Sequence, residues 1–231
     1  MRYAAFSLIS EPSKTRVGSI SSDGTTVEEF DLGVDLSEDG VVALLRADLK
    51  GQLPRPIATY AFSDIRLLAP VPRPRRNIFC VGKNYHEHAK EFSNSGFDSS
   101  AKPGEDIPSH AIFFTKPPES VTGPNTNVII PTAISTAIDY EAELTIVIGK
   151  GGKGISEADA MNHVWGYTAI NDVTARDWQQ RHKQWFLGKS FDTFCPMGPW
   201  VVTADEFDGL NAHVKCWVNG ELRQDGNSSN M

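Results

Sequence analysis

Three acidic residues recur at every second position in the segment 139–149, DYEAELTIVIG. Successive side chains of a β-strand point to opposite faces, so Asp139, Glu141 and Glu143 would share one face and apolar residues the other. Carboxylates spaced by roughly 6.5 to 7 Å repel one another unless a cation or water neutralises them. Oxygen ligands of this kind suit Mg²⁺, Mn²⁺ or Ca²⁺ better than zinc. The alternative is a strand that faces solvent, whose acids only keep the surface polar.

A fourth carboxylate follows another predicted strand, which covers residues 166–171. Asp172 comes directly after this strand, where a side chain is well placed to complete a site that a neighbouring strand begins. The alternative is that Asp172 only caps the turn that follows it.

A histidine and a glutamate lie three positions apart in the segment NYHEHAKE, residues 84–91. Asn84 is a plausible N-cap for a helix here, and the helix would bring His88 and Glu91 onto one face. A carboxylate beside an imidazole raises its basicity, which is the arrangement of a general base. The alternative is an ordinary ion pair on the surface.

The elements that must position these residues are mostly strands. We expect strands at 2–9, 16–30 with a turn at 22–24, 65–71, 78–81, 111–116, 140–148, 166–171, 200–203, 214–218 and 221–224. Helices are expected at 37–50 and 156–164, capped by Ser37 and Ser156. The predicted class is therefore α+β, mainly β. The proline-rich stretch PVPRPRR is expected to separate a small N-terminal β module, residues 1–70, from a main domain, residues 71–231.

Composition and charge favour a small-molecule partner. The 231 residues carry a net charge of −7 with no basic run, which disfavours nucleic acid and anionic membranes as partners. No stretch approaches the length of a transmembrane helix, so we expect a cytoplasmic protein, with a mitochondrial location as the alternative. The three cysteines form no CxxC pair, and neither a zinc site nor a disulfide framework is expected.

A glycine-rich turn offers a competing reading. Residues 149–154, GKGGKG, match the pattern GxGxxG between a predicted strand and a predicted helix. A dinucleotide site needs the helix to open within the motif, whereas Ser156 lies beyond the third glycine. An NAD-binding oxidoreductase is therefore the less favoured alternative, and a flexible turn the favoured one.

These segments, taken in order from residue 77 to residue 231, resemble the fumarylacetoacetate hydrolase (FAH) superfamily. The resemblance is carried by VGKNYHEHAKE (81–91), FFTKPPES (113–120), DYEAELTIVIGKGG (139–152), VWGYTAINDVTARDWQ (164–179) and GKSFDTFCPMGPW (188–200). It implies an FAH-like mixed β-roll or sandwich, and a homodimer. It also implies functional residues: Glu141, Glu143 and Asp172 as ligands of Mg²⁺ or Mn²⁺, His88, Glu91 and Lys189 as catalytic residues, and Gln179 and Lys116 as substrate-binding residues.

The resemblance further implies divalent-metal-dependent cleavage of a carbon–carbon bond in a small 2-oxo (beta-diketo) acid. The expected reactions are those of acylpyruvate or fumarylacetoacetate hydrolases and oxaloacetate decarboxylases, in which the metal polarises the 2-oxo group and stabilises the departing enolate. The family pattern continues beyond residue 231 with further strands and a Thr-Gly-Thr-Pro loop, so we expect an incomplete catalytic domain. A truncated, catalytically impaired metal-binding homologue is therefore the alternative function.

Overall fold

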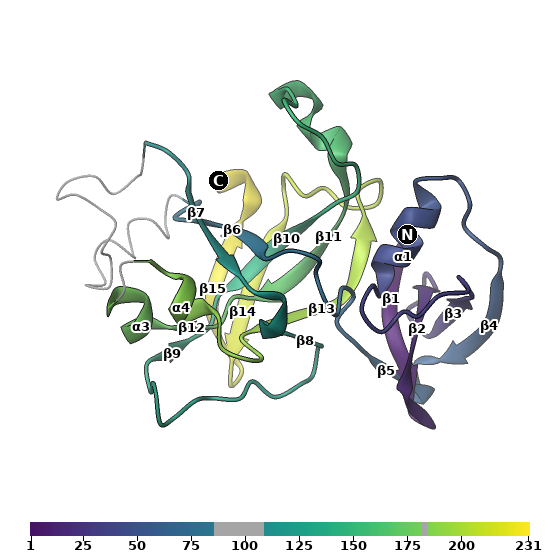
Figure 1. Cartoon of the computed structure of the whole chain (residues 1–231), viewed down its shortest axis with the longest axis horizontal. Coiled ribbons are helices and arrows are strands. Elements are labelled where there is room, and N and C mark those ends of the chain that lie inside the picture. Colours follow the sequence, from purple (N-terminus) through teal and green to yellow (C-terminus); the bar gives the residue numbers. More distant parts are fainter. Residues whose placement is uncertain (86–108, 182–183) are drawn as a thin grey trace.

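The architecture is dominated by one large sheet, as the computed structural model of residues 1–85, 109–181 and 184–231 shows (Figure 1). The main path of this nine-stranded sheet runs β10-β11-β13-β1-β2-β3-β4, with β5 paired to β1 and β8 paired to β13. Its strands are β1 (Arg2–Leu8), β2 (Glu11–Ile20), β3 (Thr26–Phe30), β4 (Pro56–Ala61), β5 (Ile65–Leu67), β8 (Val121–Thr122), β10 (Ala142–Ile148), β11 (Val164–Asn171) and β13 (Cys195–Thr203).

Three two-stranded sheets and a few short helices complete the described fold. The small sheets pair β6 (Ile78–Gly82) with β7 (Ile112–Lys116), β9 (Ile138–Asp139) with β12 (Thr174–Ala175), and β14 (His213–Val218) with β15 (Glu221–Asn227). The α-helices are α1 (Val41–Asp48), α3 (Arg176–Arg181) and α4 (Phe186–Lys189); the 3₁₀ turns are η1 (Phe62–Asp64), η2 (Pro118–Ser120), η3 (Glu157–His163) and η4 (Ser228–Asn230). The predicted class, α+β with mainly β structure, is confirmed. Among the described residues, no helix is long and apolar enough to cross a membrane.

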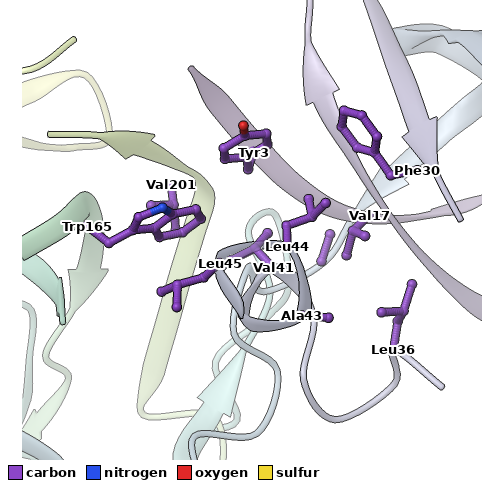
Figure 2. Packing of buried hydrophobic residues seen from close by; sticks show 11 residues of the cluster. Tyr3, Val17, Phe30, Leu36, Val41, Ala43, Leu44, Leu45, Trp165 and Val201 are labelled. Carbon is purple, nitrogen blue, oxygen red and sulfur yellow. The ribbon is translucent and has the colours of Figure 1, made fainter. Parts of the chain in front are cut away.

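The N-terminal strands share both a sheet and a core with the rest of the chain. β1 pairs antiparallel with β13, and Tyr3 lies opposite Val201. The Tyr3 ring stacks on Trp165 of β11, with ring centroids 5.6 Å apart and planes 2° apart, beside Leu44 of α1 (Figure 2). The Trp165 indole N–H donates to Asp48 Oδ2 at 2.8 Å, which ties α1 to β11. Burial of these side chains therefore joins residues 1–70 to the main sheet; a domain boundary at residue 70 stays a prediction.

Two predicted turns are confirmed by their backbone angles. Asn219 and Gly220, with φ of 52° and 82°, join β14 to β15, as a two-residue hairpin turn with two positive φ angles requires. Gly24, with φ of 73°, lies in the turn between β2 and β3. Glycine tolerates this left-handed region because it has no Cβ.

The predicted helices are shorter than their patterns suggested. The helix expected over 37–50 begins only at Val41, and Gly40 rather than Ser37 is its N-cap, because Gly40 (φ 52°) turns the chain and the Val41 N–H donates to the Pro70 carbonyl. The helix expected over 156–164 is the 3₁₀ segment η3; Ser156 precedes it, but its hydroxyl donates to Asp159 instead of capping the backbone. Helices α3 and α4 were not predicted.

The strand predicted over 140–148 begins two residues later, at Ala142. β9 ends at Asp139 and β10 begins at Ala142, so Tyr140 and Glu141 lie between two strands of different sheets. The break arises because β9 pairs with β12 whereas β10 pairs with β11. Of the three acids in this segment, only Glu143 lies within β10, so alternation along one strand does not by itself place Asp139 and Glu141.

Gly166 is required by the close packing of β11 against β13 in the large sheet. A Cβ at this position of β11 would lie 2.4 Å from the Val202 carbonyl oxygen of β13 and 2.8 Å from Val201 Cγ1. Gly166→Ala should therefore lower the free energy of unfolding by about 1–3 kcal/mol, the usual cost of overpacking. Urea denaturation measures this loss. Gly151→Ala is the control, because a Cβ there meets nothing within 4 Å, and equal losses in the two variants would contradict the packing argument.

Candidate metal centre and active site

The carboxylates of Glu141, Glu143 and Asp172 are brought together by the pairing of β10 with β11. The antiparallel register places Glu143 opposite Ile170 and Ala142 opposite Asn171, so the start of β10 meets the end of β11. Beyond the strands, the Asp172 N–H donates to the Glu141 carbonyl at 2.7 Å. The site therefore forms where these two strands meet, as the position of Asp172 after its strand had indicated.

Two buried lysines and an arginine neutralise the carboxylates. The Lys189 ammonium donates to Glu141 Oε2 at 2.6 Å and to Asp172 Oδ2 at 2.8 Å. The Lys116 ammonium donates to Asp172 Oδ1 at 2.7 Å, and Arg176 Nη2 lies 2.7 Å from Glu141 Oε1. Lys116, Lys189 and Asp172 are almost entirely buried, at 0%, 1% and 2% exposure. A charged group at such depth is destabilising unless it is paired with an opposite charge. The network supplies such a partner for each of these three side chains.

Glu143 is the carboxylate that these cations neutralise least. Its burial, together with the charges of Glu141 and Asp172, raises the pKa of Glu143 to about 8, and Lys189 only partly offsets this. Burial alone would also raise the pKa of Asp172, but the ammonium groups of Lys189 and Lys116 outweigh burial and hold that pKa below its usual value. Glu143 is only partly exposed, and its carboxyl group resists ionisation beside two other acids. A cation added at this place would therefore be stabilised.

A polar cavity of about 280 Å³ opens beside Glu141 and Glu143. Its walls include Asp139, Glu141, Glu143, Arg176 and Gln224. Asp139 accepts hydrogen bonds from Arg176 Nε and Nη2, at 2.9 and 2.7 Å. The cavity therefore presents both negative and positive groups, and its size suits a small acid with several oxygens.

The carboxylate oxygens of this site are ligands that suit a hard divalent ion, although two of the carboxylates are paired with the Lys189 ammonium in this structure. Three carboxylates supply oxygen ligands only, which Mg²⁺ and Mn²⁺ prefer. Across residues 1–85, 109–181 and 184–231, no group of three His, Cys, Asp or Glu side chains is arranged to hold a metal ion as it stands. The reason is visible in the contacts, since Lys189 bridges Glu141 and Asp172. An ion bound by these oxygens would compete with that ammonium.

The predicted substrate-binding residues lie in the described part of the structure, whereas the predicted catalytic dyad does not. Lys116 makes three hydrogen bonds inside the protein, to Asp172 and to the carbonyls of Val173 and Lys189, which favours holding the site together over contacting a substrate. Gln179 is buried, and its Oε1 accepts from Arg176 Nη1 at 3.0 Å. His88 and Glu91 lie outside the described residues, so the dyad stays a prediction.

Two residues of this site were not singled out from the sequence. Arg176 contacts Asp139, Glu141 and Gln179 from helix α3; its position three residues before Gln179, on one helical face, was the available signal. Gln224 bonds to the backbone of Ala142 from β15, 82 positions away, and no local pattern marks it.

Two features outside the carboxylate cluster could in principle carry other chemistry, a cysteine and the glycine-rich turn. Cys195 is fully buried, and this burial raises the pKa of its thiol to about 12, as a core thiol requires. The glycine-rich turn at 149–154 leads into the 3₁₀ segment η3, so no α-helix opens within it. The geometry therefore gives no support to a dinucleotide site there, because such a site uses the N-terminus of an α-helix.

Comparison with known proteins agrees with this picture. Residues 77–231 match the family model described as fumarylacetoacetate (FAA) hydrolase C-terminal. Oxaloacetate tautomerase YisK of Bacillus subtilis is 47% identical over 173 residues, which cover 74% of this chain and 54% of that protein. Human oxaloacetate tautomerase FAHD2A, mitochondrial, is 43% identical over 196 residues, which cover 84% of this chain and 57% of that protein. The chain thus spans little more than half the length of these curated relatives.

Solved structures agree in fold over the whole chain. A fumarylacetoacetate hydrolase from Exiguobacterium antarcticum has a TM-score of 0.75 and 36% identity, and the match covers 100% of this chain and 76% of that one. Maleylpyruvate hydrolase from Sphingobium sp. SYK-6, in complex with manganese(II) ion and pyruvate, has a TM-score of 0.69 and 28% identity, with coverage of 100% and 78%. The family match over residues 77–231 and the tautomerase relatives together show that this chain belongs to the fumarylacetoacetate hydrolase family.

Proposed function

We propose that this chain carries the active site of a divalent-metal-dependent enzyme that acts on a small 2-oxo acid. The observation that carries the proposal is the cluster of Glu141, Glu143 and Asp172. Lys189 bridges Glu141 and Asp172, and Glu141, Glu143 and Arg176 line one polar cavity. The proposed ions are Mg²⁺ and Mn²⁺; the manganese and pyruvate named for maleylpyruvate hydrolase support this choice.

Each group has a proposed role that follows from its charge and position. Glu141, Glu143 and Asp172 would hold the ion, which supplies Lewis-acid polarisation of a 2-oxo group when bound. Lys189 brings a buried positive charge to the same carboxylates, where it would stabilise negative charge that develops on the substrate oxygen. Arg176 and Gln179 would orient the substrate carboxylate, and His88 with Glu91 would transfer the proton.

The reaction we place first is keto–enol conversion of oxaloacetate, with carbon–carbon bond cleavage second. Both reactions pass through an enolate, so one set of charges serves either. The names of the two tautomerase relatives favour the first, and the hydrolases among the similar structures support the second. The resemblance alone had favoured cleavage, because the dyad of His88 and Glu91 was taken as typical of hydrolases and decarboxylases. The residues that would stabilise the enolate are the same for both reactions.

We expect Mg²⁺ or Mn²⁺ to raise the melting temperature of the chain. A ligand at 100 times its Kd stabilises a fold by about 2.7 kcal/mol, and Glu141→Ala combined with Glu143→Ala should remove this effect. Thermal denaturation with and without metal measures it. Glu157→Ala with Asp159→Ala is the matched control, because it removes two exposed acids at the same spacing. A melting temperature of the unaltered chain that does not respond to metal would refute the proposed site.

Turnover is tested separately from metal binding. Oxaloacetate is added to the metal-loaded chain; enol absorbance follows tautomerisation, and pyruvate formation follows decarboxylation, with His88→Ala as the inactive control. Acetylpyruvate tests hydrolysis in the same way. Metal binding without any turnover would favour the truncated, catalytically impaired metal-binding homologue, and saturable binding of NAD would favour the dinucleotide alternative.

The remaining expectations are also proposals. A homodimer is proposed from the family resemblance, and sedimentation of the chain tests it. The cytoplasm is the proposed location, with the mitochondrion as the alternative because several curated relatives have mitochondrial in their names. Expression of the chain with a fluorescent fusion at its C-terminus distinguishes the two.

A further inference from the structure

We infer that Gln224 is a positioning residue that sets the spacing of Glu141 and Glu143. This inference rests on the proposed function, because it concerns the same metal ligands. The Gln224 side chain accepts a hydrogen bond from the Ala142 N–H at 2.9 Å and donates one to the Ala142 carbonyl at 2.6 Å. Ala142 is the residue between the two glutamates, so one amide holds the peptide groups that connect them.

The geometry of β10 explains why an amide is needed at this place. In the part of the chain that the structure describes, β10 ends the main path of the large sheet and pairs with β11 alone. Backbone groups of a strand point alternately to its two sides, and those of Glu141 are used on the β11 side: its N–H donates to Asn171 Oδ1 and its carbonyl accepts from Asp172. The N–H and carbonyl of Ala142 therefore face the other side. There the Gln224 side-chain amide makes the two hydrogen bonds that the backbone of a neighbouring strand would otherwise make.

Hydrogen bonds on both sides of the chain hold the backbone that carries Glu141 and Glu143. Asn171 and Asp172 fix Glu141 from one side, and Gln224 fixes Ala142 from the other. Without the amide, the peptide groups on either side of Ala142 could rotate, and the two carboxylates would lose their fixed separation. Partners that orient metal ligands in this way typically change metal affinity by about 10 to 100-fold.

The hairpin that carries Gln224 does not need this side chain for its own folding. The Gln224 backbone pairs with Cys216 in the β14–β15 ladder, and the turn at Asn219 and Gly220 sets the register. The side chain is partly exposed and lines the cavity beside Glu141 and Glu143. Its two hydrogen bonds are thus directed to the site and not to the hairpin.

The test is a metal titration of the purified chain, with Gln224→Met, which keeps the length of the side chain and removes both hydrogen bonds. The Kd for Mg²⁺ should rise by about 10 to 100-fold. The Kd for Mn²⁺ should rise less, because Mg²⁺ demands a more regular octahedron of ligands. A purely structural role would change the metal-free melting temperature without changing the ratio of the two affinities. Gln52→Met is the matched control, since this side chain is exposed and far from β10 in the sequence.

Gln224→Asn is the second variant, because its shorter amide stays polar but cannot span both Ala142 groups. Weaker Mg²⁺ binding and a shifted Mg²⁺ to Mn²⁺ ratio in either folded variant, with Gln52→Met unchanged, support the inference. Unchanged Mg²⁺ affinity in a folded Gln224 variant overturns it and leaves the proposed function standing. A chain that binds neither ion before any substitution overturns the metal site itself, and this inference with it.

Discussion

Lys116→Met should lower the free energy of unfolding by about 3–5 kcal/mol, the usual cost of removing one partner of a buried charge pair. The Lys116 ammonium is completely buried and donates to Asp172 at 2.7 Å and to the carbonyls of Val173 and Lys189 at 3.1 and 2.7 Å. Methionine fills similar space, but it leaves these buried acceptors without their donor. A loss of this size is a large part of the roughly 5–15 kcal/mol by which such domains are stable.

Urea denaturation at neutral pH measures the loss for Lys116→Met directly. Lys50→Met is the control, because Lys50 is exposed beyond the end of α1 and the same substitution there should cost little. A loss below about 1 kcal/mol for Lys116→Met would mean that water or a neighbouring donor replaces the ammonium. The result also separates two roles, since a residue that only contacts substrate would not be needed for stability.

Lys189→Met should produce two opposite changes, a less stable metal-free chain and tighter binding of Mg²⁺. The variant leaves Glu141 Oε2 and Asp172 Oδ2 without the cation that bridges them at 2.6 and 2.8 Å, and we expect a loss of about 3–5 kcal/mol in the absence of metal. A divalent ion can restore the missing positive charge between the same oxygens. Added Mg²⁺ should therefore raise the melting temperature of the variant more than that of the unaltered chain.

Thermal denaturation over a Mg²⁺ titration tests this prediction, with Lys153→Met as the control at an exposed position. If the chain turns over a 2-oxo acid, Lys189→Met should also reduce kcat by about 10²- to 10³-fold, the effect of removing one oxyanion-stabilising group. A variant that is destabilised but responds to Mg²⁺ no more than the unaltered chain would show that the ion does not use these two oxygens.

The pattern of residues was sufficient to predict the strands on which the site is built. Alternation of apolar and acidic residues indicated the strand that contains Glu143, and Asp172 was correctly placed after the strand 164–171. The turn at Asn219 and Gly220 was predicted because two positive φ angles favour those residue types. These features could be read locally because side-chain alternation and turn geometry depend on neighbours in the sequence.

Local patterns were less reliable where distant contacts decide the backbone. The helix over 37–50 was overextended because the N–H of Val41 takes its partner from Pro70, far outside the helical window. The strand over 140–148 was predicted to begin too early, because the different pairing partners of β9 and β10 leave no trace in the alternation.

The sequence by itself determined the mainly β class, the family resemblance and the three acids proposed to bind metal. The resemblance had also named Lys116 and Lys189, but only the tertiary structure shows what each contacts. Lys116 reaches Asp172 from β7 across 56 positions, and Lys189 reaches Glu141 from α4 across 48. Gln224, which the sequence did not mark, reaches Ala142 from β15 across 82. The physical reason is that alternation selects a face of a strand, whereas the partners of that face depend on which strands pair and which chain segments are buried against it.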